Sequence, residues 1–412
     1  MRMLVIDDDP LILRALNRTF HTQRPEWEVV LADSGEEAVR KMAESRFDIV
    51  LTDMQMPGMD GSQVLHYARQ LQPGAVRVVL SGHAPLRRIL EAEGDYHRFL
   101  VKPVDPNDLV VILDSFCLNP AEEDSRLARS IVAGLERLPS LTRHLVALKE
   151  QLEQPTPNLQ RITAIIGQDI GMASKVLKLV NSAYMPFRRS ITSLTQAVEF
   201  LGVDLLQEMV LSRDLLAGAV DEHPEGLSLE DVWAHSVRVG RLARELVYKE
   251  TGDRKAAEES YSVGLLHDIG LVAMAIHPGC AYHSVLEKGR AQGDLLTKME
   301  RQTFGTDDIQ VGAQLVSLWG LPTPFASAIQ KQYLTSLDDH PTLISLALHA
   351  AHSWLDQHIS PGEFTEGTAM LDYPEADLAS ADSRWNVLVK KWKEGRPPRG
   401  ASPDDAVQRS TP

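Results

Sequence analysis

Short apolar runs and helix-period segments alternate five times within the first 117 residues of the chain. The apolar runs occupy residues 3–6, 27–32, 47–53, 75–81 and 96–101. The segments that follow them repeat apolar residues at helical spacing, over 10–20, 34–46, 61–71, 84–94 and 105–116. Strands that alternate with helices in this way predict a doubly wound α/β unit, in which helices cover both faces of a five-stranded parallel sheet.

Residue types with useful chemistry stand at the carboxyl ends of these predicted strands. Asp7 and Asp8 follow the first strand, Asp53 ends the third, Ser81 ends the fourth and Lys102 follows the fifth. Because functional groups gather at this edge of a parallel sheet, we expect the three carboxylates to repel each other and to bind Mg²⁺. Asp53 would then be the nucleophile toward a phosphoryl group, with Ser81 donating to its oxygens and Lys102 balancing its charge. The competing interpretation is that the acids only cap the following helices.

Four motifs in this region closely resemble the receiver domain of two-component response regulators, a flavodoxin-like fold. They are "IDD" at 6–8, "LTDMQMPGMDG" at 51–61, "LSG" at 80–82 and "VKPV" at 101–104. The resemblance covers residues 1–118. It implies phosphorylation on Asp53 by a sensor histidine kinase or a small phosphodonor.

The same resemblance implies roles for individual residues. Mg²⁺ would be held by Asp8, Asp53 and the backbone carbonyl of Gln55, with Asp7 acting through water. Phe99 stands where the family keeps an aromatic switch. The bond before Pro103 is often cis in this family, and X–Pro is the kind of bond where the cis form costs least.

The remainder of the chain predicts a second, all-α domain over residues 131–358. Helix-period segments there are joined by short Pro and Gly breaks, and we expect about ten helices and no strand. The polar stretch 119–130 is expected to be a linker, although it could equally continue a helix out of the first domain. Residues 359–394 predict a C-terminal helical extension, and 395–412 have the composition of a disordered tail.

Two histidines and an aspartate of the second domain are candidate metal ligands. His267 and Asp268 are adjacent, and on a helix their side chains would diverge by about 100° and still reach one ion. His235, on another long amphipathic segment, would supply a second nitrogen. The alternative is that these are buried histidines whose polar atoms are satisfied by hydrogen bonds.

The motif "HDIG" at 267–270 resembles the HD superfamily of metal-dependent phosphohydrolases. Together with "LPSLTRHLVAL" at 138–148, "VNSAYMPFRRSITSLTQAVEFLG" at 180–202 and "LVSLWGLPTPFASAIQKQY" at 315–333, it resembles the HDOD domain. That domain is a relative of the HD hydrolases found mostly in signalling proteins. The resemblance covers residues 130–358.

An active HD site resembles H…HD…D, and this chain departs from it at the last position. His352 stands where that aspartate aligns, and Asp356 lies one turn further on. The dinuclear HD-GYP relatives need further histidines, one of which is replaced by Asp308. The candidate degenerate site therefore comprises His235, His267, Asp268, Asp308 and His352. We expect a hydrogen-bonded polar cluster, with a transition-metal site and catalysis by His267 and Asp268 as the alternative.

Composition narrows the function classes. The formal net charge of −15 opposes a nucleic-acid-binding surface, and two cysteines are too few for a disulfide framework. No run reaches the roughly 18 apolar residues of a membrane span, so a cytoplasmic protein is expected. The sequence predicts a response regulator whose HDOD domain binds an unknown output partner, or which forms a phosphorylation-dependent homodimer. The alternative is a phosphorylation-gated phosphohydrolase acting on a nucleotide or cyclic dinucleotide.

Overall fold

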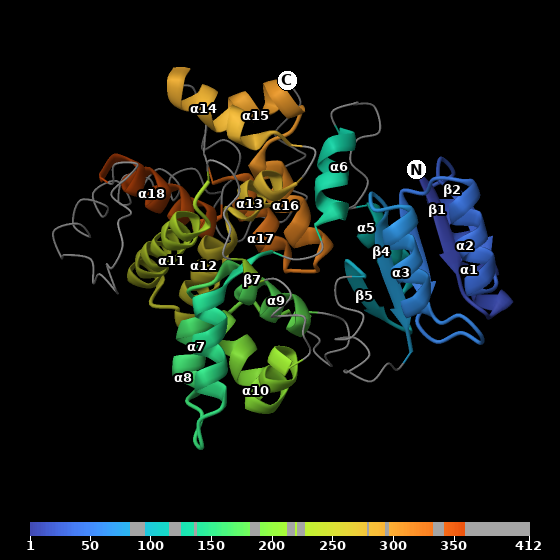
Figure 1. Cartoon of the computed structure of the whole chain (residues 1–412), viewed down its shortest axis with the longest axis horizontal. Coiled ribbons are helices and arrows are strands. Elements are labelled where there is room, and N and C mark those ends of the chain that lie inside the picture. Colours follow the sequence, from blue (N-terminus) through green and yellow to red (C-terminus); the bar gives the residue numbers. More distant parts are fainter. Residues whose placement is uncertain are drawn as a thin grey trace, which may run out of the picture.

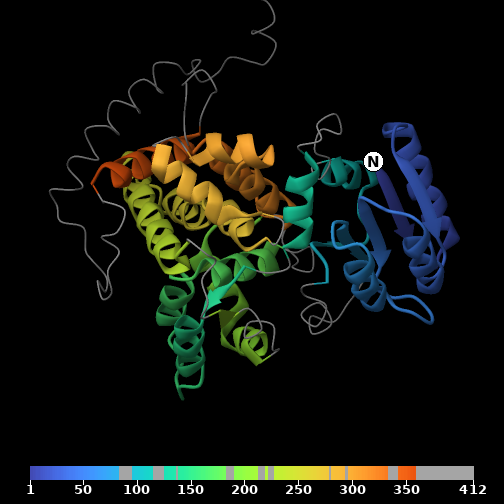
Figure 2. The same ribbon diagram turned by 45° about the horizontal axis from the view of Figure 1, so that its top comes forward.

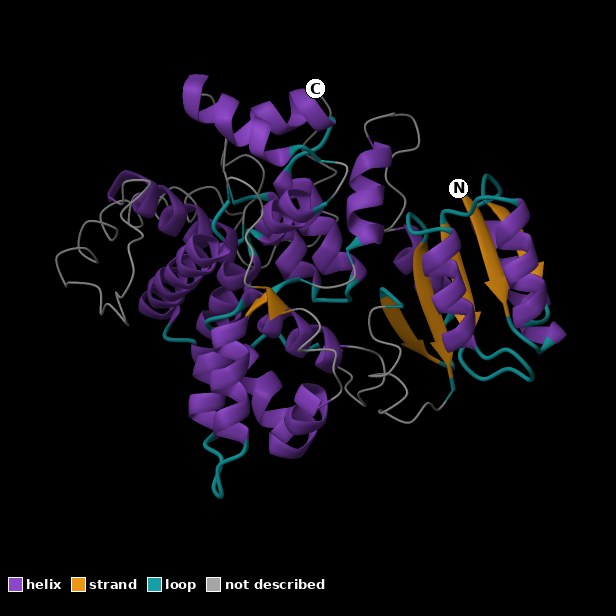
Figure 3. Cartoon of the chain, in the orientation of Figure 1, coloured by secondary structure: helices purple, strands orange, loops and turns teal. Residues whose placement is uncertain are grey.

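The computed structural model consists of an α/β part and a larger helical part (Figure 1). It describes residues 1–82, 95–114, 125–135, 138–181, 190–211, 219–220, 227–277, 280–292, 296–332 and 342–358. The strands of the α/β part gather at one end of the molecule, and helices make up nearly all of the rest (Figure 3). The predicted helix at 84–94, the extension at 359–394 and the tail at 395–412 lie outside the described residues.

The α/β part is a five-stranded parallel sheet in the order β2-β1-β3-β4-β5, as predicted. The strands are β1 (Arg2–Ile6), β2 (Glu28–Ala32), β3 (Ile49–Asp53), β4 (Val76–Ser81) and β5 (Arg98–Val101). The central strands β1, β3 and β4 are buried almost throughout, because helices cover both faces. Asp53 pairs with Leu80 and Ser81 with Val101, which brings the carboxyl ends of the strands to one edge.

Four described helices cover the sheet. They are α1 (Pro10–Gln23), α2 (Gly35–Glu44), α3 (Gly61–Leu71) and α5 (Pro106–Asp114). Helices α1 and α5 pack together on one face, and α2 and α3 on the other. Alternate strand residues take opposite sides: Met3 and Val5 belong to the core beneath α1 and α5, whereas Leu4 and Ile6 belong to the core beneath α2 and α3.

The helical part begins with α6, inside the expected linker. Its helices are α6 (Ser125–Gly134), α7 (Thr142–Leu152), α8 (Leu159–Ile166), α9 (Ile170–Asn181), α10 (Leu194–Leu211), α11 (Leu229–Thr251), α12 (Arg254–Leu266), α13 (Ile269–Ile276), α14 (Tyr282–Gln292), α15 (Leu296–Phe304), α16 (Asp308–Leu318), α17 (Thr323–Gln330) and α18 (Leu343–His358). The expectation of no strand is wrong in one place. The short strands β6 (Ser140–Leu141) and β7 (Ala219–Val220) form a parallel pair.

The helices α11 and α12 cross in close contact, and this crossing positions the motif that follows α12. A Cβ on Gly264 would lie 2.5 Å from the Cα of Gly240, so only glycine pairs allow the two backbones to approach this closely. The sequence predicts His267 and Asp268 together on one helix, whereas the structure has two helices here. The chain turns at His267 and Asp268, which end α12 and begin α13.

Helix α6 connects the two parts. Both views place it between the sheet and the helices α13 and α16 (Figures 1 and 2), and it packs against both of those helices. Its buried residues Ala128, Ile131 and Val132 belong to the same apolar cluster as the α1–α5 side of the sheet. One continuous core therefore runs from the α/β part into the helical part.

Candidate functional site

Three carboxylates meet at the carboxyl edge of the sheet, as the sequence predicted. One oxygen from each of Asp7, Asp8 and Asp53 lies within 4.8 Å of the others. The Lys102 ammonium binds two of them, with Nζ at 2.6 Å from Asp7 Oδ2 and at 3.1 Å from Asp53 Oδ2. The structure thus brings four predicted site residues into one group. The Lys102–Pro103 bond is cis, in accord with the resemblance.

Burial and neighbouring charges have opposing effects on the pKa values of Asp53 and Lys102. Burial raises the pKa of Asp53, and the Lys102 charge and hydrogen bond oppose that rise. Burial alone would lower the pKa of Lys102, but its hydrogen bond to Asp7 and the charge of Asp53 outweigh burial and raise that pKa. Lys102 therefore stays charged beside the carboxylates.

The donor set fits Mg²⁺. Three carboxylates within 4.8 Å offer only hard oxygen ligands, which this cation prefers, and they carry more negative charge than one lysine balances. Asp7, Asp8 and Asp53 are the residues that would hold it. Gln55, whose carbonyl the resemblance adds to the ligands, follows Asp53 by two residues in the loop after β3.

Ser81 and Phe99 lie on the strands next to this group. Ser81 ends β4 with its hydroxyl buried, and its Oγ has no hydrogen-bond partner among the described residues. That leaves the hydroxyl available to a phosphoryl oxygen. Phe99, on β5, is buried and packs edge-on against Tyr96, with ring centroids 6.0 Å apart. Phe99 belongs to a small buried cluster with Met54, Leu65, Val79 and Tyr96.

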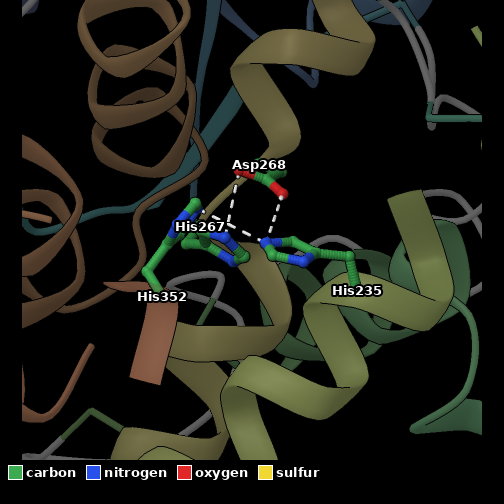
Figure 4. A group of neighbouring side chains, drawn as sticks. All are labelled: His235, His267, Asp268 and His352. Carbon is green, nitrogen blue, oxygen red and sulfur yellow. Dashed lines mark hydrogen bonds and ion pairs between the residues drawn. The ribbon is translucent and has the colours of Figure 1, made fainter. Parts of the chain in front are cut away.

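A second group of candidate residues converges in the helical part (Figure 4). One ligand atom from each of His235, His267, Asp268 and His352 lies within 4.8 Å of the others. They come from α11, from the α12–α13 junction and from α18. His235 Nε2 lies 3.4 Å from His352 Nε2 and 3.8 Å from Asp268 Oδ2, and His267 Nε2 lies 3.1 Å from Asp268 Oδ1.

Asp308, the fifth predicted member, is not part of this group. It begins α16, and its carboxyl is paired with Glu300 in a buried cluster with Tyr282. Burial and the Glu300 charge raise the pKa of Asp308 well above its usual value, which favours the protonated form of its carboxyl. The side chain of Asp356, the other alternative ligand, lies outside the described residues.

The sheet and the helical part meet at β5 through contacts that the sequence did not reveal. His97 is fully buried and donates from Nε2 to the carbonyl of Ala133 on α6 at 2.9 Å. The Arg98 guanidinium reaches the carbonyl of Ser317 in the last turn of α16 at 3.5 Å, where a helix end attracts a cation. Lys178 of α9 lies over the rings of Tyr96 and Trp319, at 5.3 and 6.0 Å from their centroids.

Burial shifts the pKa values of the two residues that make these contacts, Arg98 and His97. It lowers the pKa of Arg98 to about 10, and the guanidinium remains charged at neutral pH. Burial, together with the charges of Arg77 and Lys178, lowers the pKa of His97 well below its usual value. A neutral His97 accepts from the backbone N–H of Arg77 at Nδ1 while its Nε2 donates to Ala133. Asp95 and His97, polar residues immediately before β5, were the available signal for an interface.

Comparisons with known proteins identify two domains. A family model described as the response regulator receiver domain matches residues 3–114, and one described as the HDOD domain matches residues 138–334. Helix α6 lies outside both matches. Among the described residues, no helix combines the length and apolar character needed to cross a membrane.

Individual relatives resemble parts of the chain. An uncharacterized protein of Treponema pallidum is 29% identical over 219 residues, which are 50% of this chain and 40% of that protein. The transcriptional regulatory protein GlrR of Escherichia coli is 32% identical over 113 residues, 27% of this chain and 25% of that protein. This chain thus spans less than half the length of these relatives. The crystal structure of the MmoQ response regulator from Methylococcus capsulatus is 22% identical and covers 61% of this chain and 97% of its own, with a TM-score of 0.47.

Proposed function

Since this chain is a response regulator that joins a receiver domain to an HDOD domain, we propose that phosphorylation of Asp53 controls a non-catalytic output, in which the HDOD domain binds a protein partner. The convergence of Asp7, Asp8, Asp53 and Lys102 on one edge of the sheet carries this proposal. A sensor histidine kinase or a small phosphodonor would supply the phosphoryl group.

The chemistry at Asp53 follows from its neighbours. The Asp53 carboxylate attacks phosphorus and takes up the phosphoryl group as an acyl phosphate, while the donor leaves. Mg²⁺, held by Asp7, Asp8, Asp53 and the Gln55 carbonyl, would offset the negative charge of the transferred group. The Lys102 ammonium provides a second cation, and Ser81 is placed to donate to a phosphoryl oxygen.

The route from this site to the helical domain runs along β5. Lys102 follows β5, Phe99 is buried on it, and the residues just before and at its start contact α6, α9 and α16. A switching domain has two states that differ in free energy by about a few kcal/mol, and we propose that phosphorylation shifts their populations. We propose that the shift changes the contacts of His97 and Arg98, so that the HDOD domain exposes its partner-binding surface or two chains dimerise.

This proposal is tested with acetyl phosphate and Mg²⁺ on the full chain. Intact mass spectrometry should show the mass gain of one phosphoryl group in the wild type and none in Asp53→Asn. Hydrogen exchange of the modified protein should then rise around residues 96–98 and 131–133. A mass gain at another residue would refute the assignment of Asp53. A modified protein with unchanged exchange at the β5 contacts would refute the route through β5.

A second candidate function is favoured by the group of His235, His267, Asp268 and His352. Its ligand atoms could hold a metal that activates water, which would make the domain a phosphohydrolase. Turnover of a cyclic dinucleotide that is lost in both His267→Ala and Asp268→Ala would establish this function in place of the binding output.

A further inference from the structure

We propose that the boundary between the receiver and the HDOD domain contains a binding site for one small anion, with chloride the best fit in size, and that the bound anion holds the two domains together. The site is the cavity between β5 and the helices α9 and α16, where Arg98, Lys178 and Trp319 are among the lining residues. The proposal does not depend on phosphorylation of Asp53.

The walls of this cavity are basic and aromatic. Arg98 comes from β5, the edge strand of the sheet on the side of the helical domain (Figure 1), whereas Lys178 and Trp319 come from the HDOD domain. Among the described residues that line the cavity, none is acidic. The space that a water molecule can occupy in it is about 10 Å³, which is enough for one water or one monatomic ion. Charge and size therefore both favour a small anion.

The indole N–H of Trp319 lacks an acceptor within the described part of the chain. Trp319 directly follows α16 and is only 4% exposed. Its Nε1 is buried and has no hydrogen-bond partner among the described residues. An indole nitrogen can only donate, and a buried donor without a partner is unfavourable. An acceptor in the cavity that Trp319 lines would satisfy it.

Arg98 brings a positive charge to the same cavity. A guanidinium carries five N–H donors, and the hydrogen bond that this one makes among the described residues is to the Ser317 carbonyl at 3.5 Å. Burial lowers the pKa of Arg98 to about 10, as expected for a cation withdrawn from water without a carboxylate beside it. A water molecule in the cavity would accept from the indole, but an anion would also compensate the charge of Arg98.

The end of α16 fixes the position of the Arg98 guanidinium. A Cβ on Gly320 would lie 1.7 Å from Arg98 Nη1 and 2.3 Å from Arg98 Cζ, so the guanidinium lies directly against the backbone of Gly320. Gly320 also has a φ of 79°, a conformation that favours glycine. The donors of Arg98 are thus in place before an anion arrives, which lowers the entropic cost of binding.

An anion bound here would stabilise the contact between the domains. Arg98 belongs to the receiver and Trp319 to the HDOD domain, so the anion loses one of its donors when the domains separate. Because binding and docking are linked, an anion that binds the docked arrangement more tightly must also stabilise it. Ordinary screening depends on the ionic strength and not on the kind of anion, so the two effects can be separated.

The test compares sodium chloride with sodium gluconate on the full chain at equal ionic strength. Gluconate is too large for the cavity, whereas chloride can enter it. Relative to gluconate, chloride at roughly ten times its Kd should raise the Tm of the wild type by about 3–6 °C. It should also slow hydrogen exchange around residues 96–98 and 317–321. Equal exchange in the two salts would overturn the proposal.

Replacement of Trp319 by phenylalanine keeps an aromatic ring and removes the N–H donor. Trp319→Phe should lose the difference between the two salts. Trp233→Phe is the matched control, because Trp233 on α11 is also buried with an Nε1 that has no partner among the described residues, but it does not line the cavity. Trp233→Phe should keep the difference. The same response to chloride in both variants would overturn the assignment to this cavity.

Bromide can locate the anion directly. Crystals of the full chain soaked in bromide should show an anomalous peak between Trp319 Nε1 and the Arg98 guanidinium, and Arg98→Gln crystals should lack it. Absence of this peak in the wild type would overturn the site. A peak in the crystal without a chloride effect in solution would indicate an adventitious ion only, and would overturn its role in holding the domains together.

Discussion

Replacement of Gly270 by alanine should push α13 away from α16. A Cβ on Gly270 would lie 1.8 Å from the carbonyl oxygen of Asp308 and 2.6 Å from the backbone nitrogen of Gly312. Contacts of Cβ atoms below 3.0 Å essentially never occur, so the helices must separate by at least about 1.2 Å at this point. Both obstructing atoms belong to the backbone, and no side-chain rotation can relieve the overlap.

The loss of stability in Gly270→Ala follows from the close packing of the protein interior. Overpacking of a close-packed interior costs about 1–3 kcal/mol, and the rigid backbone of α16 cannot yield by a change of rotamer. For a helical domain of this size, each kcal/mol lowers the Tm by about 2–4 °C, so Gly270→Ala should lower it by about 2–12 °C. Because α13 begins directly after Asp268, the displacement should also move the Asp268 carboxylate relative to His235.

The assay is thermal unfolding followed by circular dichroism. Gly134→Ala is a suitable control, since a Cβ there would meet only the His277 ring at 3.7 Å, an ordinary contact. Its Tm should stay equal or rise slightly, because alanine favours a helix more than glycine does. A Tm of Gly270→Ala within about 1 °C of the wild type would refute the close contact between α13 and α16.

Three other predictions concern single side chains. The unfolded chain protonates His97 near its ordinary pKa whereas the folded protein does not, so the free energy of unfolding should fall below about pH 6.5, with a slope of up to about 1.4 kcal/mol per pH unit from this residue. Urea unfolding at several pH values should show a smaller slope in His97→Gln, and an unchanged slope would contradict the low pKa. Asn181→Ala should lower the free energy of unfolding, measured in urea, by about 1–3 kcal/mol. The reason is that the Asn181 amide donates to the carbonyls of Leu177 and Ile191 and accepts from the Ile191 N–H. A smaller decrease would mean that water replaces these bonds in the variant. Burial raises the pKa of the Cys280 thiol to about 11, so iodoacetamide at about pH 8 should not label it in the folded protein, and rapid labelling would contradict its burial.

The receiver fold could be predicted closely because its information is local. Each strand is a short apolar run, and its last residues carry the functional groups, so Asp53, Ser81 and Lys102 were found with their neighbours before any contact was known. The position of His352 was also predictable, since the resemblance placed it at a ligand position.

Features that depend on long-range contacts could not be predicted in this way. The turn at His267 and Asp268 was missed because the apolar pattern continues through it without a break. Asp308 was a candidate member of the degenerate site, but the sequence does not show that Glu300 lies beside its carboxyl. His97 and Arg98 bind the backbone carbonyls of residues that are distant in sequence. Every residue has a backbone carbonyl, so the sequence does not indicate which one is the partner.

Helix α6 belongs to neither matched domain, yet it carries the Ala133 carbonyl that His97 binds and contacts the helices that start beside the metal-ligand candidates. If the proposed route through β5 is right, joining this receiver to another HDOD domain at the limits of the domain matches would remove the α6 contacts of that route. Such a chimera should accept the phosphoryl group but transmit nothing. The response to phosphorylation would then depend on the ten residues of α6. Substitutions in α6 would have to be matched by substitutions in the receiver and HDOD surfaces that it contacts.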